Sequence, residues 1–185
     1  DRWLAAGGRR ADWTAEMQRV DHEEPGRFRD RFVVIDENGY SGLTAAELGL
    51  GIGEREWIRR STVIRVEHEF THYATKRLFG SMRNNLLDEI IADFMGVTAA
   101  FGRFEARWFL CFLGLENYPV IRETGRIHAY RGDLDDKAFA LLARLVVDAA
   151  AGLERISRAR YRPAKRIDFF LELTGMTLEL LAAKA

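Results

Sequence analysis

His68-Glu69-Phe70-Thr71-His72 is the stretch that most constrains this chain, because it places two histidines four residues apart within a helical pattern. Residues with this spacing lie on one face of an α-helix, about 40° apart around its axis at ~3.6 residues per turn. The two imidazoles can therefore share one metal ion. Glu69 lies about 100° around the helix from His68, within reach of a metal-bound water without being a ligand. The alternative is a core helix that merely carries two histidines.

A third protein ligand for such a site follows along the chain. Glu89 comes seventeen residues after His72, and Asp93 stands four residues after Glu89. Both carboxylates can therefore face the histidine helix from one side of a second helix. A catalytic zinc site takes three protein ligands, and its histidines commonly hydrogen-bond to a carboxylate. We expect Glu89 to be the third ligand and Asp93 to hydrogen-bond to His68; a solvated acidic helix face is the alternative.

The segment from His68 to Gly96 resembles the zinc-binding core of the gluzincins, the thermolysin-like metallopeptidases. Its first part matches the pattern H-E-x-T-H. Its second part matches the pattern E-x-x-[SA]-D-x-x-G at four positions: Glu89, Ala92, Asp93 and Gly96. The resemblance implies that His68, His72 and Glu89 bind Zn²⁺. It also implies that Glu69 is the general base and that Asp93 supports a ligand histidine.

A second, weaker resemblance covers residues 126–132, whose sequence is Arg-Ile-His-Ala-Tyr-Arg-Gly. These residues resemble the gluzincin segment that carries the histidine acting on the transition state. The family usually has Asn and Ser where this chain has Tyr130 and Arg131. The resemblance implies that His128 donates a hydrogen bond to the developing oxyanion, and Tyr130 is the second candidate for that role.

The composition is that of an ordinary soluble domain. The chain has 185 residues, of which 48% are apolar and 30% charged, and its 28 basic residues balance 28 acidic ones. A net charge of zero argues against a general nucleic-acid or anionic-membrane binder. The single cysteine, Cys111, excludes an internal disulfide and slightly favours a reducing, cytoplasmic location. No apolar run approaches the ~20 residues that a membrane span requires, and no signal-peptide pattern is found.

Local patterns predict one α+β domain over residues 1–185, with a small N-terminal sheet and a mainly helical remainder. The β-rich residues 31–36 predict a strand, which is either a substrate-binding edge, as in gluzincins, or an ordinary core strand. Helices are expected over residues 54–78, ended by Gly80, and over residues 85–104, and the short link makes them antiparallel neighbours. Further helices are expected over 107–115, 136–156 and 167–185, the last interrupted at Gly175. The sheet and the active-site helix would occupy residues 1–79, and the other helices residues 80–185.

These features predict a zinc metallopeptidase that acts on a peptide or protein substrate. Zn²⁺ would activate a water molecule, and Glu69 would take its proton and pass it to the leaving amine. One alternative is an intracellular peptidase that cleaves a single regulatory protein. The other is a non-catalytic, zinc-stabilised binding module, for which Cys111 would serve as a fourth ligand that closes the site. The presence of Glu69 favours catalysis, because a structural site needs no base.

Overall fold

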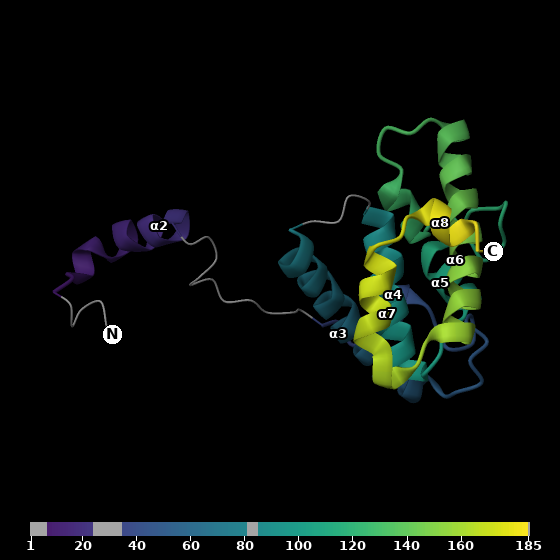
Figure 1. Cartoon of the computed structure of the whole chain (residues 1–185). Coiled ribbons are helices and arrows are strands. Elements are labelled where there is room, and N and C mark those ends of the chain that lie inside the picture. The colour runs from purple at the N-terminus through teal and green to yellow at the C-terminus, as the bar shows by residue number, and fades with distance from the viewer. Residues whose placement is uncertain (1–6, 24–34, 81–84, 185) are drawn as a thin grey trace. The chain divides into compact units, whose positions relative to one another are not determined.

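The described residues of the computed structural model, 7–23, 35–80 and 85–184, are organised as helices and connecting loops (Figure 1). The β pairing among them is one isolated bridge between Asn117 and Val120. The expected α+β architecture with an N-terminal sheet is therefore wrong, and the fold is all-α. Most of the predicted strand over residues 31–36 lies outside the described residues, and Ile35 and Asp36 have no regular structure. The physical reason is that a β-rich run needs neighbouring strands for its hydrogen bonds, and the described chain offers it helices only.

The chain divides into two units, residues 1–34 and residues 35–185. The described part of the first unit contains η1 (Arg10–Asp12) and α2 (Trp13–Glu23). On α2, the exposed Arg19 pairs with Glu16 and Glu23, one turn before it and one turn after it. The second unit carries all the remaining elements. None of the described helices is both long enough and apolar enough to cross a membrane.

Two antiparallel helices, α3 (Glu54–Phe79) and α4 (Asn85–Phe101), pack along each other in the second unit. Residues further along α3 contact residues nearer the start of α4, as the pairs Arg60–Ala100 and His68–Asp93 show. Both helices were predicted, and their observed bounds agree with the predicted ones within a few residues. Gly80 caps α3 as predicted, with a φ of 78° that glycine adopts without strain.

Along α3, one residue in every three or four is buried, in the order Trp57, Ser61, Ile64, His68, Thr71 and Thr75. This spacing produces a narrow buried stripe along one side of the helix. Large apolar residues occur only in the first half of the stripe. In the second half of the helix, the large apolar side chains are instead exposed, namely Phe70, Tyr73, Leu78 and Phe79.

α3 and α4 approach each other closely at Gly96. A Cβ at this position would lie 2.6 Å from the carbonyl oxygen of Ile64 and 3.0 Å from its Cγ2. The first of these distances is shorter than real Cβ atoms tolerate, so the contact requires glycine. Asp93 lies one turn before Gly96, and His68 lies one turn after Ile64. The close contact therefore brings Asp93 and His68 together.

The remaining helices complete the core around α4. They are α5 (Ala106–Leu113), α6 (Asp136–Arg160), α7 (Arg166–Thr174) and α8 (Leu178–Ala182). The sequence predicted them with small differences in their ends, including the interruption at Gly175, which caps α7. α7 packs on α4, and α8 packs on α6 (Figure 1). Phe94 of α4 lies at the centre of an aromatic cluster with Phe104, Tyr161 and Phe169.

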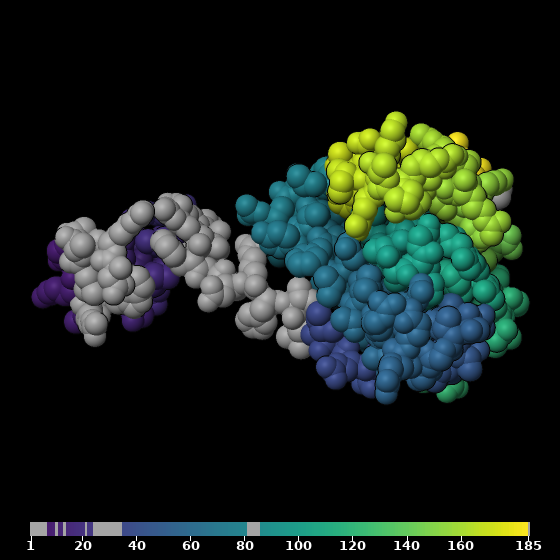
Figure 2. Space-filling model, turned by 90° about the horizontal axis from the view of Figure 1, so that it is seen from below, coloured from purple at the N-terminus to yellow at the C-terminus, as the bar shows by residue number. Residues whose placement is uncertain are grey.

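The loop before α3 is fixed to that helix. Arg65 donates hydrogen bonds of 2.7–3.0 Å to the main-chain carbonyls of residues 36, 38 and 39. Ser61 accepts a hydrogen bond of 2.9 Å from the main-chain N–H of Tyr40, the first residue of η2 (Tyr40–Gly42). The loop and the first turns of α3, in blue, are on the surface on the side seen in Figure 2. The Tyr40 side chain, in contrast, is buried.

Candidate metal centre

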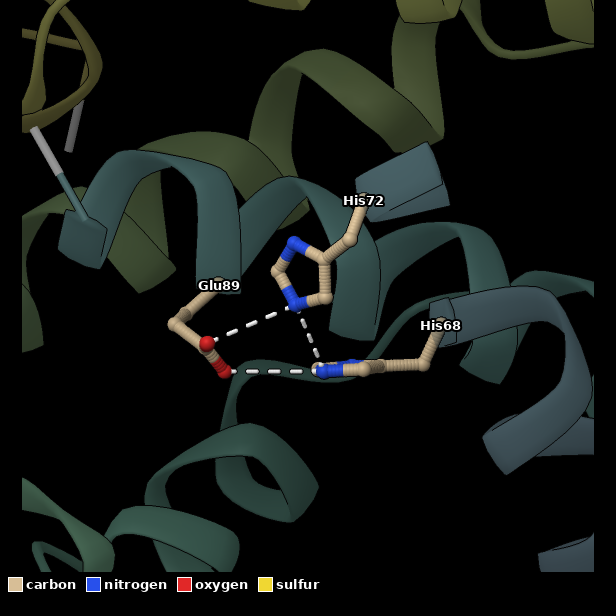
Figure 3. Close-up of side chains that lie close together, drawn as sticks. All are labelled: His68, His72 and Glu89. Atoms are coloured by element: carbon tan, nitrogen blue, oxygen red, sulfur yellow. Dashed lines mark hydrogen bonds and ion pairs between the residues drawn. The ribbon is translucent and has the colours of Figure 1, made fainter. Parts of the chain in front are cut away.

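His68 and His72 of α3 and Glu89 of α4 direct their side chains toward one point (Figure 3). The two Nε2 atoms are 2.9 Å apart, and the Glu89 oxygens lie 3.6 Å from Nε2 of His68 and 3.4 Å from Nε2 of His72. An ion held tetrahedrally at about 2.0–2.1 Å from its ligands needs ligand atoms roughly 3.3–3.4 Å apart. The observed separations lie on both sides of that value. Two imidazoles and a carboxylate therefore fit a metal such as Zn²⁺ in both chemistry and spacing.

Each histidine has a carboxylate on its other ring nitrogen. Nδ1 of His68 lies 2.8 Å from Oδ1 of Asp93, and Nδ1 of His72 lies 2.7 Å from Oδ2 of Asp88. Because a carboxylate accepts hydrogen bonds, both Nδ1 atoms donate, and the two Nε2 atoms face the common point. Asp93 lies where the sequence pattern led us to expect it. Asp88 was not expected to contact a histidine.

Asp93 is completely buried and accepts hydrogen bonds from three residues. Besides His68, the Tyr40 hydroxyl donates to Oδ1 at 2.5 Å, and Nη2 of Arg126 donates to Oδ2 at 2.7 Å. Burial alone would raise the pKa of Asp93. The charge of Arg126 and the hydrogen bonds from His68 and Tyr40 outweigh it and lower the pKa to about 2. Asp93 is therefore an anion that orients His68.

Arg126 connects this carboxylate to the candidate ligand Glu89. Its Nη2 atom lies 3.5 Å from Oε2 of Glu89, and its Nη1 atom donates to the Tyr40 hydroxyl at 3.1 Å. It is the first residue of η3 (Arg126–Tyr130). The residue before this helix, Gly125, lies in close contact with other backbone atoms. Three carboxylates (Asp88, Glu89 and Asp93) and one guanidinium thus lie around the two histidines. This excess of two negative charges suits a divalent cation.

The last residue of η3, Tyr130, also reaches the site. Burial raises the pKa of its phenol, and the nearby charge of Glu89 raises it further. The phenol therefore keeps its proton at neutral pH. His128, two residues earlier, is exposed; its Nε2 lies 3.2 Å from the carbonyl oxygen of Arg122, and its ring lies against Phe139. The structure thus brings Tyr130, and not His128, to the ligand set.

Glu69 is exposed on α3, next to His68. Within the described part of the chain, it makes no hydrogen bond or ion pair, so its carboxylate is available. Cys111 is half-buried in α5, where burial raises the pKa of its thiol. Among the described residues, the groups that converge as possible metal ligands are His68, His72 and Glu89, and Cys111 is not among them.

The charge of His72 depends on its carboxylate neighbours. Burial disfavours the charged imidazole, but hydrogen bonds to Asp88 and Glu89 outweigh this effect and raise the pKa of His72 to about 10. Burial would likewise raise the pKa of Glu89, but the hydrogen bond from His72 and the nearby positive charges give a net lowering. Without a metal, His72 is therefore a cation at neutral pH. A metal ion that binds here must displace that proton.

Comparison of the chain with curated proteins and with solved structures finds no match. One family does match, over residues 1–185, and it is described as a family of unknown function, DUF7005. Because the match extends over the whole chain, this protein belongs to the DUF7005 family.

Proposed function

We propose that this protein is a zinc-dependent hydrolase that cleaves peptide bonds. The observation that carries the proposal is the convergence of His68, His72 and Glu89 at separations suited to one tetrahedral ion. It is supported by the carboxylates on Nδ1 of both histidines, since metal-binding histidines are usually oriented in this way. Three protein ligands leave a fourth position for water or substrate, as in catalytic zinc sites.

When bound, Zn²⁺ supplies a Lewis acid and lowers the pKa of a bound water to about 7. The next residue after His68, Glu69, is proposed to accept the proton of that water and to return it to the leaving amine. Its carboxylate, which is exposed and has no partner among the described residues, is suited to both transfers. Tyr130, which is protonated and lies at Glu89, is the proposed donor to the developing oxyanion. His128 was the first expectation for this role, but it donates its hydrogen bond within its own loop.

The likeness to gluzincins is proposed for the pair of ligand-bearing helices only. The fold around this pair is all-α, and the described residues contain no edge strand that could bind a substrate backbone by β-addition. Substrate would therefore be held by side chains and loops around the site. The ligand set would determine the chemistry, and the surrounding side chains and loops would determine the choice of substrate.

Metal analysis and a general peptidase assay test the proposal. We expect one zinc per chain, and hydrolysis of a mixed peptide library that a chelator abolishes. Glu69→Gln should keep its zinc and its fold but lose the ~10²–10⁴-fold in rate that a general base typically contributes. The matched control is Glu123→Gln, which changes another exposed glutamate and should leave the rate unaltered. A zinc-loaded wild-type protein that is inert against the library over a broad pH range would contradict peptide hydrolysis.

A further inference from the structure

We infer that Tyr40 is a positioning residue of the metal centre. Its hydroxyl group holds Asp93, and through Asp93 it holds the ring of His68, in the orientation that binds the metal. The inference rests on the proposed metal site and extends it to a loop outside the ligand-bearing helices. Tyr40 lies 28 residues before His68 and 53 residues before Asp93, so no local pattern connects them.

The Tyr40 hydroxyl contacts three side chains of the site, Asp93, Arg126 and His68. It donates to Oδ1 of Asp93 at 2.5 Å and accepts from Nη1 of Arg126 at 3.1 Å. It also lies 2.9 Å from Nδ1 of His68. Oδ1 of Asp93 therefore receives hydrogen bonds from both Tyr40 and His68, which fixes the plane of the carboxylate. Only 5% of Tyr40 is exposed, so water cannot readily replace the hydroxyl if it is removed.

The ring of Tyr40 is itself held firmly. Phe112 of α5 packs edge-on against it, with the ring centroids 4.9 Å apart. The guanidinium groups of Arg65 and Arg126 lie over the ring, at 5.7 Å and 5.5 Å from its centroid. Ser61 holds the main-chain N–H of the same residue. Because the ring is restrained in this way, its hydroxyl is held in a fixed position beside Asp93.

The orientation of His68 depends on this support. An imidazole on a helix turns about its χ2 bond within a broad energy well, and the hydrogen bond from Nδ1 selects one orientation. If Oδ1 of Asp93 loses the Tyr40 hydroxyl, the carboxylate is held on that oxygen by His68 alone. The His68 ring would then be less restrained, and Nε2 would point less consistently at the common point. Tyr40→Phe removes only the hydroxyl and leaves the ring packing in place.

Cobalt binding tests the inference without relying on activity. Co²⁺ accepts the same ligands as Zn²⁺, and its visible spectrum reports on the geometry of its ligands. The metal-free wild type, Tyr40→Phe and a control are titrated with Co²⁺ at a temperature where all are folded. We expect Tyr40→Phe to bind Co²⁺ about 10-fold more weakly, at the lower end of the effect of outer-shell partners, and to show a changed spectrum.

The matched control is Tyr161→Phe. Tyr161 is half-buried and packs on Phe94 of α4, the helix that carries Glu89 and Asp93, and none of its described contacts involves a ligand. This control should match the wild type in affinity and spectrum. If Tyr40→Phe is too unstable to titrate, Arg126→Lys serves as the second variant. It keeps the positive charge but loses the forked group that holds Asp93 and Tyr40 together, and it should also bind Co²⁺ more weakly.

Two results would overturn the inference, and they can be told apart. If the wild type binds Co²⁺ and Tyr40→Phe or its substitute binds it with the same affinity and spectrum, Tyr40 does not position the ligands, although the metal site stands. If the wild type itself binds no Co²⁺, the metal site and the inference both fail. Weaker binding by Tyr40→Phe with an unchanged control supports the role of Tyr40.

Discussion

Gly96→Ala should destabilise this protein, although replacing glycine by alanine inside a helix usually stabilises it by about 1 kcal/mol. The new Cβ would lie 2.6 Å from the carbonyl oxygen of Ile64, a backbone atom that cannot rotate away. To restore an ordinary contact, α3 and α4 would have to separate locally by up to about 1 Å. Overpacking costs roughly 1–3 kcal/mol, and a backbone contact belongs in the upper part of that range. The expected net loss is therefore about 1–2 kcal/mol.

Thermal unfolding of the metal-free protein measures this loss. For a domain of this size, 1 kcal/mol corresponds to about 2–4 °C in Tm, so we expect a decrease of roughly 2–8 °C. Metal affinity should fall as well, because Asp93 and His68 each lie one turn from the contact. The control is Ala99→Gly at an exposed position of the same helix, which should cost about 1 kcal/mol of helix propensity and leave metal affinity unchanged. A Gly96→Ala protein as stable as the wild type, with the same metal affinity, would refute the close contact.

Three further measurements address the site. Elemental analysis should find one zinc per chain in the wild type and in His128→Ala but little in His72→Ala, and equal zinc in all three would exclude His72 as a ligand. Asp88→Asn and Asp93→Asn should each weaken zinc binding by about 10–100-fold, as measured by competition with a chelating dye, and unchanged affinity would show that the carboxylates do not support the ligands. In metal-free protein, the raised pKa of His72 stabilises the fold fully below about pH 6.5, and this contribution is lost as the pH rises through about 10. Urea unfolding in chelator between pH 6 and 10 should show this loss in the wild type, and the same slope in His72→Gln would assign it to another group.

Local periodicity was enough to predict the helix pair and the convergence of the candidate ligands on one point. His68 and His72 share a helix face because of their spacing, and Glu89 and Asp93 share one for the same reason. Gly80 signalled the end of the first helix, so the return of the second helix toward the histidines followed. These signals depend only on residues close together in the sequence. That is why the helix pair was predicted correctly in a fold whose class had been predicted wrongly.

The remaining features depend on contacts between distant segments. Tyr40 and Arg126 are separated by 86 residues, yet both bind Asp93, and neither lies in a pattern that indicates such a role. The contact of Asp88 with His72 likewise follows only from the packing of α3 on α4. The expectation of a sheet came from a short β-rich run and from the resemblance to gluzincins. A ligand motif of this length specifies a pair of helices and leaves the surrounding architecture open.

The buried stripe of α3 has a consequence for how the two ligand-bearing helices hold together. From His68 onward, the stripe contains Thr71 and Thr75, whose hydroxyl groups bond to carbonyls of α3 itself, at Glu67 and His72. Large apolar side chains are therefore absent from the buried stripe of α3 from the turn where the candidate ligands begin. An ion shared by His68, His72 and Glu89 would cross-link α3 to α4 at the turn where the large buried apolar side chains of α3 end. Such a cross-link would hold the last three turns of α3 against the core. Without the ion, the amide hydrogens of these turns would exchange before those of the rest of the helix.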